Sequence, residues 1–598
     1  MELHEGLGPA LFFVSLPLLK LGSSRKQPKV SQPPPPAPPK SPSSLKRVGS
    51  AASLSVSGLK RVGSAASLSL KKVSSELSLQ QPLPQKLQPK VWDRFLSQLP
   101  SKSSKELAWL ARIFCIWPIK AALPLSIVRF ALARASGPRS SLRSKTLDVM
   151  LGAEFLFWIH FRVKLHLLSK KPPAARTYKY PGRDRQEYES NSQEFNLLLD
   201  HFKGALPTHG DDGHVLTEGE LQVIKKQEIA NWFTVGRGSA RRIPSFNQIH
   251  RHHVSQWIAW AFWDDKWKPH LQPEIEPLVD ILENRIGAKF LACDDYQDIR
   301  PLCLNIDPPR AVHHPILHYI VTHVAATSVA AAIFRWRGFT HHTLNGQDYY
   351  HRRCRETDPS KCLKPLVFIS GIGIGTVSYE KLISAISSEN RDILLFDLPE
   401  ISLRWTPGLE HKHVPPLQTV DTISSLVKSC VHGDQGAHVV AHSFGTVVTQ
   451  WLIRLNKNET PVVSSCTLID PVCFLLISSS VAANFCYRPP VTFIDHLVSY
   501  FVAREISVDN ALHRHFQWRS NNLDPRLLPA NSAIVLSELD AFVPSGKVLR
   551  HLAAERPDVV VEVLPGHFHS QFQVVPSSLA LVTSLSKEVD VTKEWKGV

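Results

Sequence analysis

The feature that most constrains the fold of this 598-residue chain is an alternation of apolar and amphipathic runs from about residue 365 onward. The short apolar runs predict strands at 365–371, 392–399, 437–443, 464–472, 532–540 and 558–566. The amphipathic runs between them predict helices at 378–388, 419–432, 445–456 and 545–555. Continuous apolar strands that alternate with helices indicate a mostly parallel sheet covered on both faces. We therefore expect a doubly wound α/β domain over residues 361–590.

The stretch AHSFG, residues 441–445, joins a predicted strand to a predicted helix. One interpretation makes Ser443 the N-cap of that helix, a common role for serine. The other makes the stretch a nucleophile elbow, a strained turn that presents the serine hydroxyl above the strand ends. Ligands of parallel sheets bind beyond the carboxyl ends of the strands, where Ser443 is expected to lie. These five residues alone leave both interpretations open.

Two later strand ends carry residues that could activate a serine. A serine hydroxyl needs a base, and the base needs an acid that orients it. Asp540 ends the strand at 532–540, and His567 and His569 follow the strand at 558–566. Serine, acid and histidine in this chain order, each just past a strand, are typical of an α/β-hydrolase. The order favours the elbow, with Ser443 as nucleophile and Asp540 as acid.

The acid and the base both have alternatives in the sequence. Asp470 ends the strand at 464–472 and could replace Asp540, although it could also cap the turn before Pro471. Glu538 shares the strand face of Asp540 and is a weaker third candidate. We predict Asp540.

A glycine-rich turn follows the first of these strands, with Gly371, Gly373 and Gly375 in FISGIGIG. Glycines there let the chain fold back, so that a backbone N–H near Ile372 or Gly373 points at a reacting carbonyl. The N–H of Phe444 would be the second donor of this oxyanion hole. The turn lacks the Lys-Ser/Thr of a P-loop and does not match GxGxxG, which argues against a phosphate site.

The positive charge of the chain is concentrated at its amino-terminal end. The net charge is +17, but residues 1–171 hold 27 Lys/Arg against 7 Asp/Glu. Such asymmetry suggests a partner with an acidic surface. No nucleic-acid motif with interleaved aromatic residues is present, so we expect an anionic membrane surface and no nucleic acid.

The first 360 residues divide into three regions by composition. Residues 1–100 are rich in Pro and Ser, repeat LKRVGSAASLS at 45–55 and 59–69, and are predicted to be disordered. Residues 101–170 are apolar and helical, a candidate membrane segment, and 171–360 are a helical accessory region. Three stretches could touch a membrane, at 111–133, 149–161 and 316–334.

The motifs together resemble the AB-hydrolase-1 type of α/β-hydrolase, specifically a poorly characterised, membrane-associated eukaryotic branch. The resemblance rests on FISGIGIG, AHSFGT, LIDPVCFLL and HSQF and covers roughly residues 150–580. It implies a catalytic histidine followed by a small residue and glutamine, which matches His569. The Gly-His context of ordinary α/β-hydrolases matches His567 instead, so His569 is preferred and His567 kept. Ala441 departs from the glycine that many relatives carry.

We therefore expect a membrane-associated serine hydrolase that cleaves a lipid-like ester by a Ser-His-Asp triad. An aromatic-rich insert at about 474–528 is predicted to form a helical lid. The alternative is a non-catalytic membrane scaffold or lipid-binding protein with the same fold. No cofactor and no metal are expected. Nine scattered cysteines without a CxxC pair suit a reducing compartment, so we expect the catalytic domain to face the cytoplasm.

Overall fold

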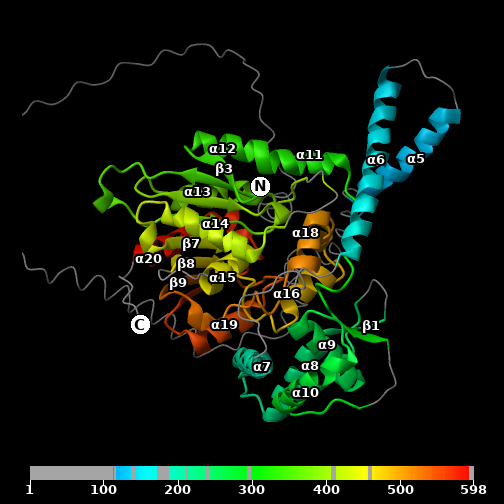
Figure 1. Ribbon diagram of the computed structural model, residues 1–598, viewed down its shortest axis with the longest axis vertical. Coiled ribbons are helices and arrows are strands. Elements are labelled where there is room, and N and C mark those ends of the chain that lie inside the picture. Colours follow the sequence, from blue (N-terminus) through cyan, green and yellow to red (C-terminus); the bar gives the residue numbers. More distant parts are fainter. Residues whose placement is uncertain are drawn as a thin grey trace, which may run out of the picture.

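The computed structural model of this chain contains an eight-stranded sheet flanked by helices (Figure 1). The described residues are 112, 116–135, 142–171, 187–210, 213–236, 241–292, 298–405, 408, 413–455 and 461–591. The predicted disorder and repeats of residues 1–100 lie outside these ranges.

The sheet has the strand order β10-β9-β8-β7-β5-β6-β4-β3. Neighbouring strands from β10 to β6 are parallel, whereas β4 runs antiparallel to both β6 and β3. The strands are β3 (Thr340–Leu344), β4 (Gln347–Arg352), β5 (Leu366–Ile369), β6 (Ile393–Asp397), β7 (Ala437–His442), β8 (Val463–Ile469), β9 (Asn531–Ser537) and β10 (Val560–Leu564). This order, with one antiparallel strand near the edge, is that of the α/β-hydrolase fold, and the predicted fold class is confirmed.

The central strands read as continuous apolar runs because both faces of the sheet are buried. Successive residues point to opposite faces, so Val367 and Ile369 of β5 enter one core and Leu366 and Phe368 enter the other. Helices α14 (Pro416–Lys428), α15 (Gly445–Leu455) and α19 (Ser545–Glu555) cover the first face. Helices α12 (Ala330–Trp336), α13 (Glu380–Ile386) and α20 (Pro576–Val591) cover the second.

The sheet begins earlier in the chain than expected. The sequence predicts that the α/β domain starts at residue 361, but β3 and β4 precede that residue and belong to the same sheet. Strand β3 forms the edge of the sheet and is exposed along its whole length, and β4 is the next strand inward. The Thr and His residues of β3 give no apolar run, so the strand signal is absent from the sequence.

The chain between β8 and β9 forms the expected helical insert. It comprises helical segments at Ser480–Ala482, Ala483–Tyr487, Phe493–Val498, Ser499–Ala503, Ile506–Asn510, Ala511–His515 and Pro525–Leu527, of which the first is α16, the third α17 and the fifth α18. The insert lies beyond the carboxyl ends of the parallel strands, where it walls a cavity over Ser443.

The helical accessory region packs on this insert. It contains α7 (Glu187–Gly204), α8 (Glu218–Ala230), α9 (Arg251–Trp263), α10 (Gln272–Ile286) and the short strands β1 (Phe233–Val235) and β2 (Ile299–Pro301). Its tryptophans 232, 257 and 260 are buried against Trp518 of the insert. The indole of Trp232 also donates to the Ile477 carbonyl at 2.8 Å. These three tryptophans therefore belong to a core that supports the insert.

Two antiparallel helices, α5 (Trp117–Ala135) and α6 (Leu142–Lys170), form a hairpin that projects from the body (Figure 1). Nearby, α11 (Ile316–Val324), a π-helical turn at Ala325–Val329, and α12 form one continuous helix. Within the described ranges, this helix of 21 residues is long and apolar enough to cross a membrane by length and composition. One side of it is nevertheless packed on the sheet domain, through Ala326, Ala330 and Phe334.

Candidate active site

Ser443 sits in a sharp turn between β7 and α15. Its φ of 51° lies in the left-handed region, which is uncommon for a residue other than glycine, and such a strained turn is what the elbow interpretation predicts. The turn needs two close glycines. A Cβ on Gly445 would lie 2.4 Å from the Ile369 carbonyl oxygen, and one on Gly371 would lie 2.9 Å from the Ser443 Cβ.

Ala441 is accommodated by the strand that precedes the turn. It lies in β7, is fully buried, and pairs with Ile369 of β5 and Leu468 of β8. Its backbone is thus extended, and its methyl group packs in the core rather than against the elbow. The departure from glycine noted in the sequence leaves the turn intact.

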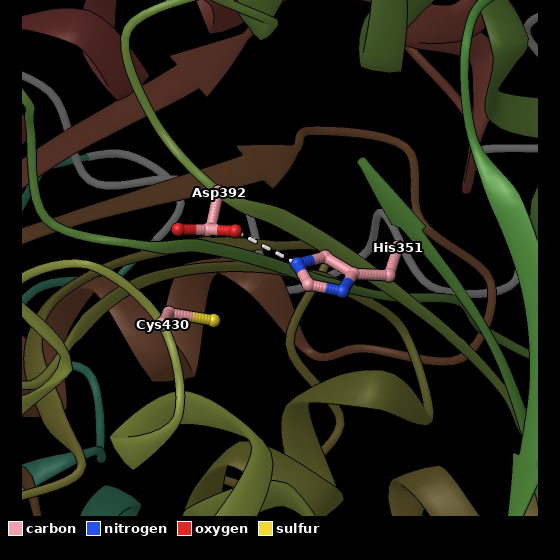
Figure 2. A group of neighbouring side chains, drawn as sticks. All are labelled: His351, Asp392 and Cys430. Carbon is pink, nitrogen blue, oxygen red and sulfur yellow. Dashed lines mark hydrogen bonds and ion pairs between the residues drawn. The ribbon is translucent and has the colours of Figure 1, made fainter. Parts of the chain in front are cut away.

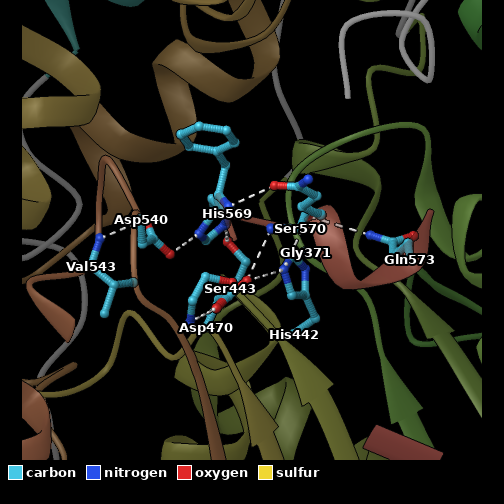
Figure 3. A network of polar contacts seen from close by, with 12 residues as sticks. Gly371, His442, Ser443, Asp470, Asp540, Val543, His569, Ser570 and Gln573 are labelled. Atoms are coloured by element: carbon cyan, nitrogen blue, oxygen red, sulfur yellow. Dashed lines mark hydrogen bonds and ion pairs between the residues drawn. The ribbon is translucent and has the colours of Figure 1, made fainter. Parts of the chain in front are cut away.

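Three side chains form a continuous line of hydrogen bonds at this turn (Figure 3). The Nε2 of His569 lies 2.9 Å from the Ser443 Oγ, and its Nδ1 lies 2.5 Å from Asp540 Oδ2. The other oxygen of Asp540 accepts hydrogen bonds from the backbone N–H groups of Phe542 and Val543. The carboxylate is therefore held in place, and it fixes the imidazole with Nε2 facing the serine.

His567, the alternative base, does not reach Ser443. Its Nδ1 lies 2.8 Å from the Pro565 carbonyl and its Nε2 2.7 Å from the Ser578 hydroxyl. Both ring nitrogens are thus engaged away from the elbow. Of the two histidines that the sequence left open, the structure brings only His569 to the serine.

The alternative acids have other partners. Asp470 is fully buried and accepts hydrogen bonds from the backbone N–H groups of Ser537 at 2.8 Å and Ser570 at 2.9 Å. Glu538 accepts from the backbone N–H of Gly566. Asp470 therefore ties the end of β9 to the loop that carries His569, beneath the site.

A second polar chain, missed by the sequence analysis, runs through buried His442. Its Nδ1 lies 2.8 Å from the Tyr379 hydroxyl, which also accepts the Gly371 N–H at 3.2 Å. Its Nε2 lies 3.1 Å from the Ser570 hydroxyl and 3.6 Å from Asp470. The chain thus links the glycine turn to the loop of His569. The only signal in the sequence is a polar residue inside an apolar strand end.

The two histidines beside Ser443 differ in their protonation. Burial of the His569 imidazole disfavours its charged form, but the Asp540 carboxylate outweighs burial and raises the pKa of His569 above its ordinary value. Burial lowers the pKa of His442 to about 4, so that this ring is neutral near pH 7. His569 is therefore the stronger base of the two.

The predicted oxyanion donors are only partly free. The N–H of Gly373 donates to the Ile401 carbonyl at 3.0 Å, so the prediction of Gly373 as a donor is wrong. Within the described part of the chain, the N–H groups of Ile372 and Phe444 make no hydrogen bond, and both residues line the cavity above Ser443. These two N–H groups remain available to an oxyanion.

The cavity above Ser443 is mainly apolar. Ser443, His569 and Ser570 line it, and the insert contributes walls that include Leu497, Val498, Val502 and Leu512. Two charged lining residues, Arg488 and Asp495, pair with each other at 2.7 Å. The cavity can therefore hold a bulky apolar group next to the serine hydroxyl.

Two groups in the described ranges have side chains that could hold a metal ion. Figure 2 shows His351, Asp392 and Cys430, where Asp392 lies 2.8 Å from the His351 Nε2 and also accepts the Val431 N–H. Asp392 precedes β6, at the opposite end of the strands from Ser443. The other group is His442, Asp470 and His569. In both groups the carboxylate, Asp392 or Asp470, already accepts hydrogen bonds from other protein groups.

No family model matches the chain, and no curated protein matches it. Solved esterase structures are similar to it. One is an esterase from Pseudomonas putida, with 16% identity over 48% of this chain and 94% of that chain and a TM-score of 0.33.

A second is an esterase from Pyrobaculum calidifontis, with 14% identity over 47% of this chain and 98% of that chain and a TM-score of 0.31. A third is brefeldin A esterase, a bacterial homologue of human hormone sensitive lipase, with 13% identity over 45% of this chain and 85% of that chain and a TM-score of 0.31. Likeness at this level says nothing of activity. The α/β-hydrolase fold follows from the strand order itself.

Proposed function

We propose that this chain is a membrane-associated serine hydrolase that cleaves carboxylic esters of apolar acids. The observation that carries the proposal is the hydrogen-bonded line from Ser443 through His569 to Asp540 at the floor of an apolar cavity. A buried acid, an oriented imidazole and a strained serine are the parts that acyl transfer requires.

In this proposal, His569 acts as the general base. Its Nε2 takes the Ser443 proton as the Oγ attacks the ester carbonyl, and Asp540 stabilises the imidazolium that forms. His569 then gives this proton to the alcohol oxygen of the ester. The alcohol departs, and the acyl group stays bound to the Ser443 Oγ. Water, activated by His569 in the same way, releases the acid and restores the serine.

The tetrahedral intermediate carries a negative oxygen that needs donors. The N–H groups of Ile372 and Phe444 are the candidates because both border the cavity and neither has a protein acceptor within the described part of the chain. Donors of this kind typically contribute about 2.7–4 kcal/mol each to the transition state.

The lining of the cavity supports a lipid-like ester as substrate. Aliphatic and aromatic side chains favour a hydrocarbon group by the hydrophobic effect, whereas a peptide would bring backbone groups that find few polar partners there. Association with a membrane and a cytoplasm-facing catalytic domain complete the proposal, since a lipid-like substrate resides in a bilayer.

Fluorophosphonate labelling of the full chain tests the catalytic part. Wild type is expected to form a covalent adduct that peptide mapping places at Ser443, and Ser443→Ala is expected to form none. Ser429→Ala, on the exposed end of α14, is the matched control and should label like wild type. Absence of labelling in folded wild type would contradict a hydrolase and favour a lipid-binding or scaffold role.

A further inference from the structure

The α5–α6 hairpin exposes many large apolar side chains. Val149 is 71% exposed, Leu156 67%, Met150 63% and Leu125 62%. The others on the hairpin are Trp117, Ile127, Val128, Leu132, Leu147, Ile159, Val163 and Leu167. Single exposed apolar residues are normal, but so many on two adjacent helices mark an interaction surface.

The hairpin is also strongly basic. Residues 117–171 contain 10 Lys/Arg and 2 Asp/Glu, and exposed Lys145, Arg162 and Lys170 lie among the apolar side chains. Long basic side chains beside an apolar face are typical of helices that lie in a membrane interface with anionic lipid. Residues 1–111 hold 16 Lys/Arg against 5 Asp/Glu, so like charge disfavours them as the cover, and it disfavours a second copy of the hairpin too.

The base of the hairpin is attached to the insert. The guanidinium of Arg112 donates to His496 of α17 at 3.0 Å, and the Lys120 ammonium lies 5.5 Å from the Tyr500 ring centroid. Near the carboxyl end of α6, which also lies at the base, Leu168 packs against Ile506 of α18. The Leu168 carbonyl accepts a hydrogen bond from Arg514 at 3.3 Å. An ion pair between Arg129 and Asp148 at 3.0 Å holds α5 to α6.

The elements that receive these contacts are the ones that wall the cavity. Leu497, Val498 and Val502 lie on the same helical run as His496 and Tyr500, and Leu512 precedes Arg514 by two residues. The hairpin is therefore attached directly to the wall of the cavity.

We propose that the α5–α6 hairpin docks in the interface of an anionic lipid bilayer and thereby holds the insert over Ser443 at the membrane surface. The role at the cavity rests on the proposed hydrolase function, whereas docking does not. The bilayer then delivers the apolar ester to the cavity without passage through water.

Flotation of the full chain with vesicles tests docking directly. Wild type is expected to float with vesicles of phosphatidylcholine and phosphatidylserine and roughly tenfold less with phosphatidylcholine alone. The variant V149S/M150S/L156S should bind the vesicles that contain phosphatidylserine roughly tenfold more weakly than wild type. The matched control V215S/V223S/L291S removes equally exposed apolar side chains from the accessory region and should bind like wild type.

The same two variants separate docking from catalysis. V149S/M150S/L156S should hydrolyse a soluble short-chain ester within about twofold of wild type, yet lose roughly tenfold of its rate on an apolar ester carried in the anionic vesicles. The proposal would be overturned if this variant floated like wild type. It would also be overturned if the substitutions changed the oligomeric state of the protein and left its flotation unchanged. Normal flotation with no hydrolysis of either ester by wild type would instead refute the proposed function and leave docking standing.

Discussion

The sheet domain and the α5–α6 hairpin both contain strongly apolar helices, but the apolar side chains are buried in the first and exposed in the second. In α15, every residue from Gly445 to Leu452 is buried against the sheet or the insert. In α6, by contrast, Val149, Met150 and Leu156 are all more than 60% exposed. Apolar composition therefore does not identify core. A helix that the described part of the chain leaves uncovered is a candidate for contact with a surface outside the chain.

Removal of the proposed base, His569, is expected to have the largest effect and to act on the sheet domain alone. His569→Ala should lower kcat/KM on a soluble ester roughly 10⁴-fold, because the serine loses its proton acceptor. Steady-state kinetics measures this loss, and vesicle flotation of the same variant should not change. His567→Ala is the matched control, since that ring contacts Pro565 and Ser578 instead, and its kcat/KM should stay within about threefold of wild type. Equal losses in both variants would contradict the assignment of the base.

Ester hydrolysis and vesicle binding should also differ in their dependence on pH. His569 must be neutral to accept a proton, and the Asp540 carboxylate raises its pKa above the ordinary value of about 6.5. The midpoint of the acidic limb of kcat/KM should therefore lie above pH 6.5, with roughly a hundredfold loss two pH units below that midpoint. Vesicle binding through exposed Lys and Arg should change little between pH 6 and 8. A limb centred below pH 6.5 would contradict the ion pair at the site.

A pair of glycine substitutions compares how tightly the two regions are packed. Gly445→Ala would place a Cβ 2.4 Å from the Ile369 carbonyl oxygen, and should lower the free energy of unfolding by about 1–3 kcal/mol. Gly152→Ala in α6 meets nothing within 4 Å, and should raise helix stability by up to about 1 kcal/mol. Denaturant unfolding measures both changes. Destabilisation by Gly152→Ala would show that the hairpin packs on something the chain itself supplies.

Most of the sheet could be predicted because its central strands are buried on both faces, which forces continuous apolar runs onto the sequence. The grouping of Ser443, Asp540 and His569 could be predicted for a related reason, since the sheet brings together residues at the carboxyl ends of its parallel strands. Strands β3 and β4 could not. Strand β3 is the edge strand and is exposed along its whole length, and β4 beside it is only partly buried. Both strands therefore tolerate polar residues, and no continuous apolar run marks them.

The sequence by itself determined the central strands and the helices between them along the chain, and the set of residues that could activate Ser443. Only the tertiary structure chose among them. His567 and His569 are two residues apart, and spacing does not say which faces the serine. That choice depends on a turn with φ of 68° at Gly566 and 69° at Ser570, held by Glu538 and Asp470 from other segments. Likewise, the acceptor for the Gly373 N–H is Ile401, and such long-range partners are set by packing rather than by local residue type.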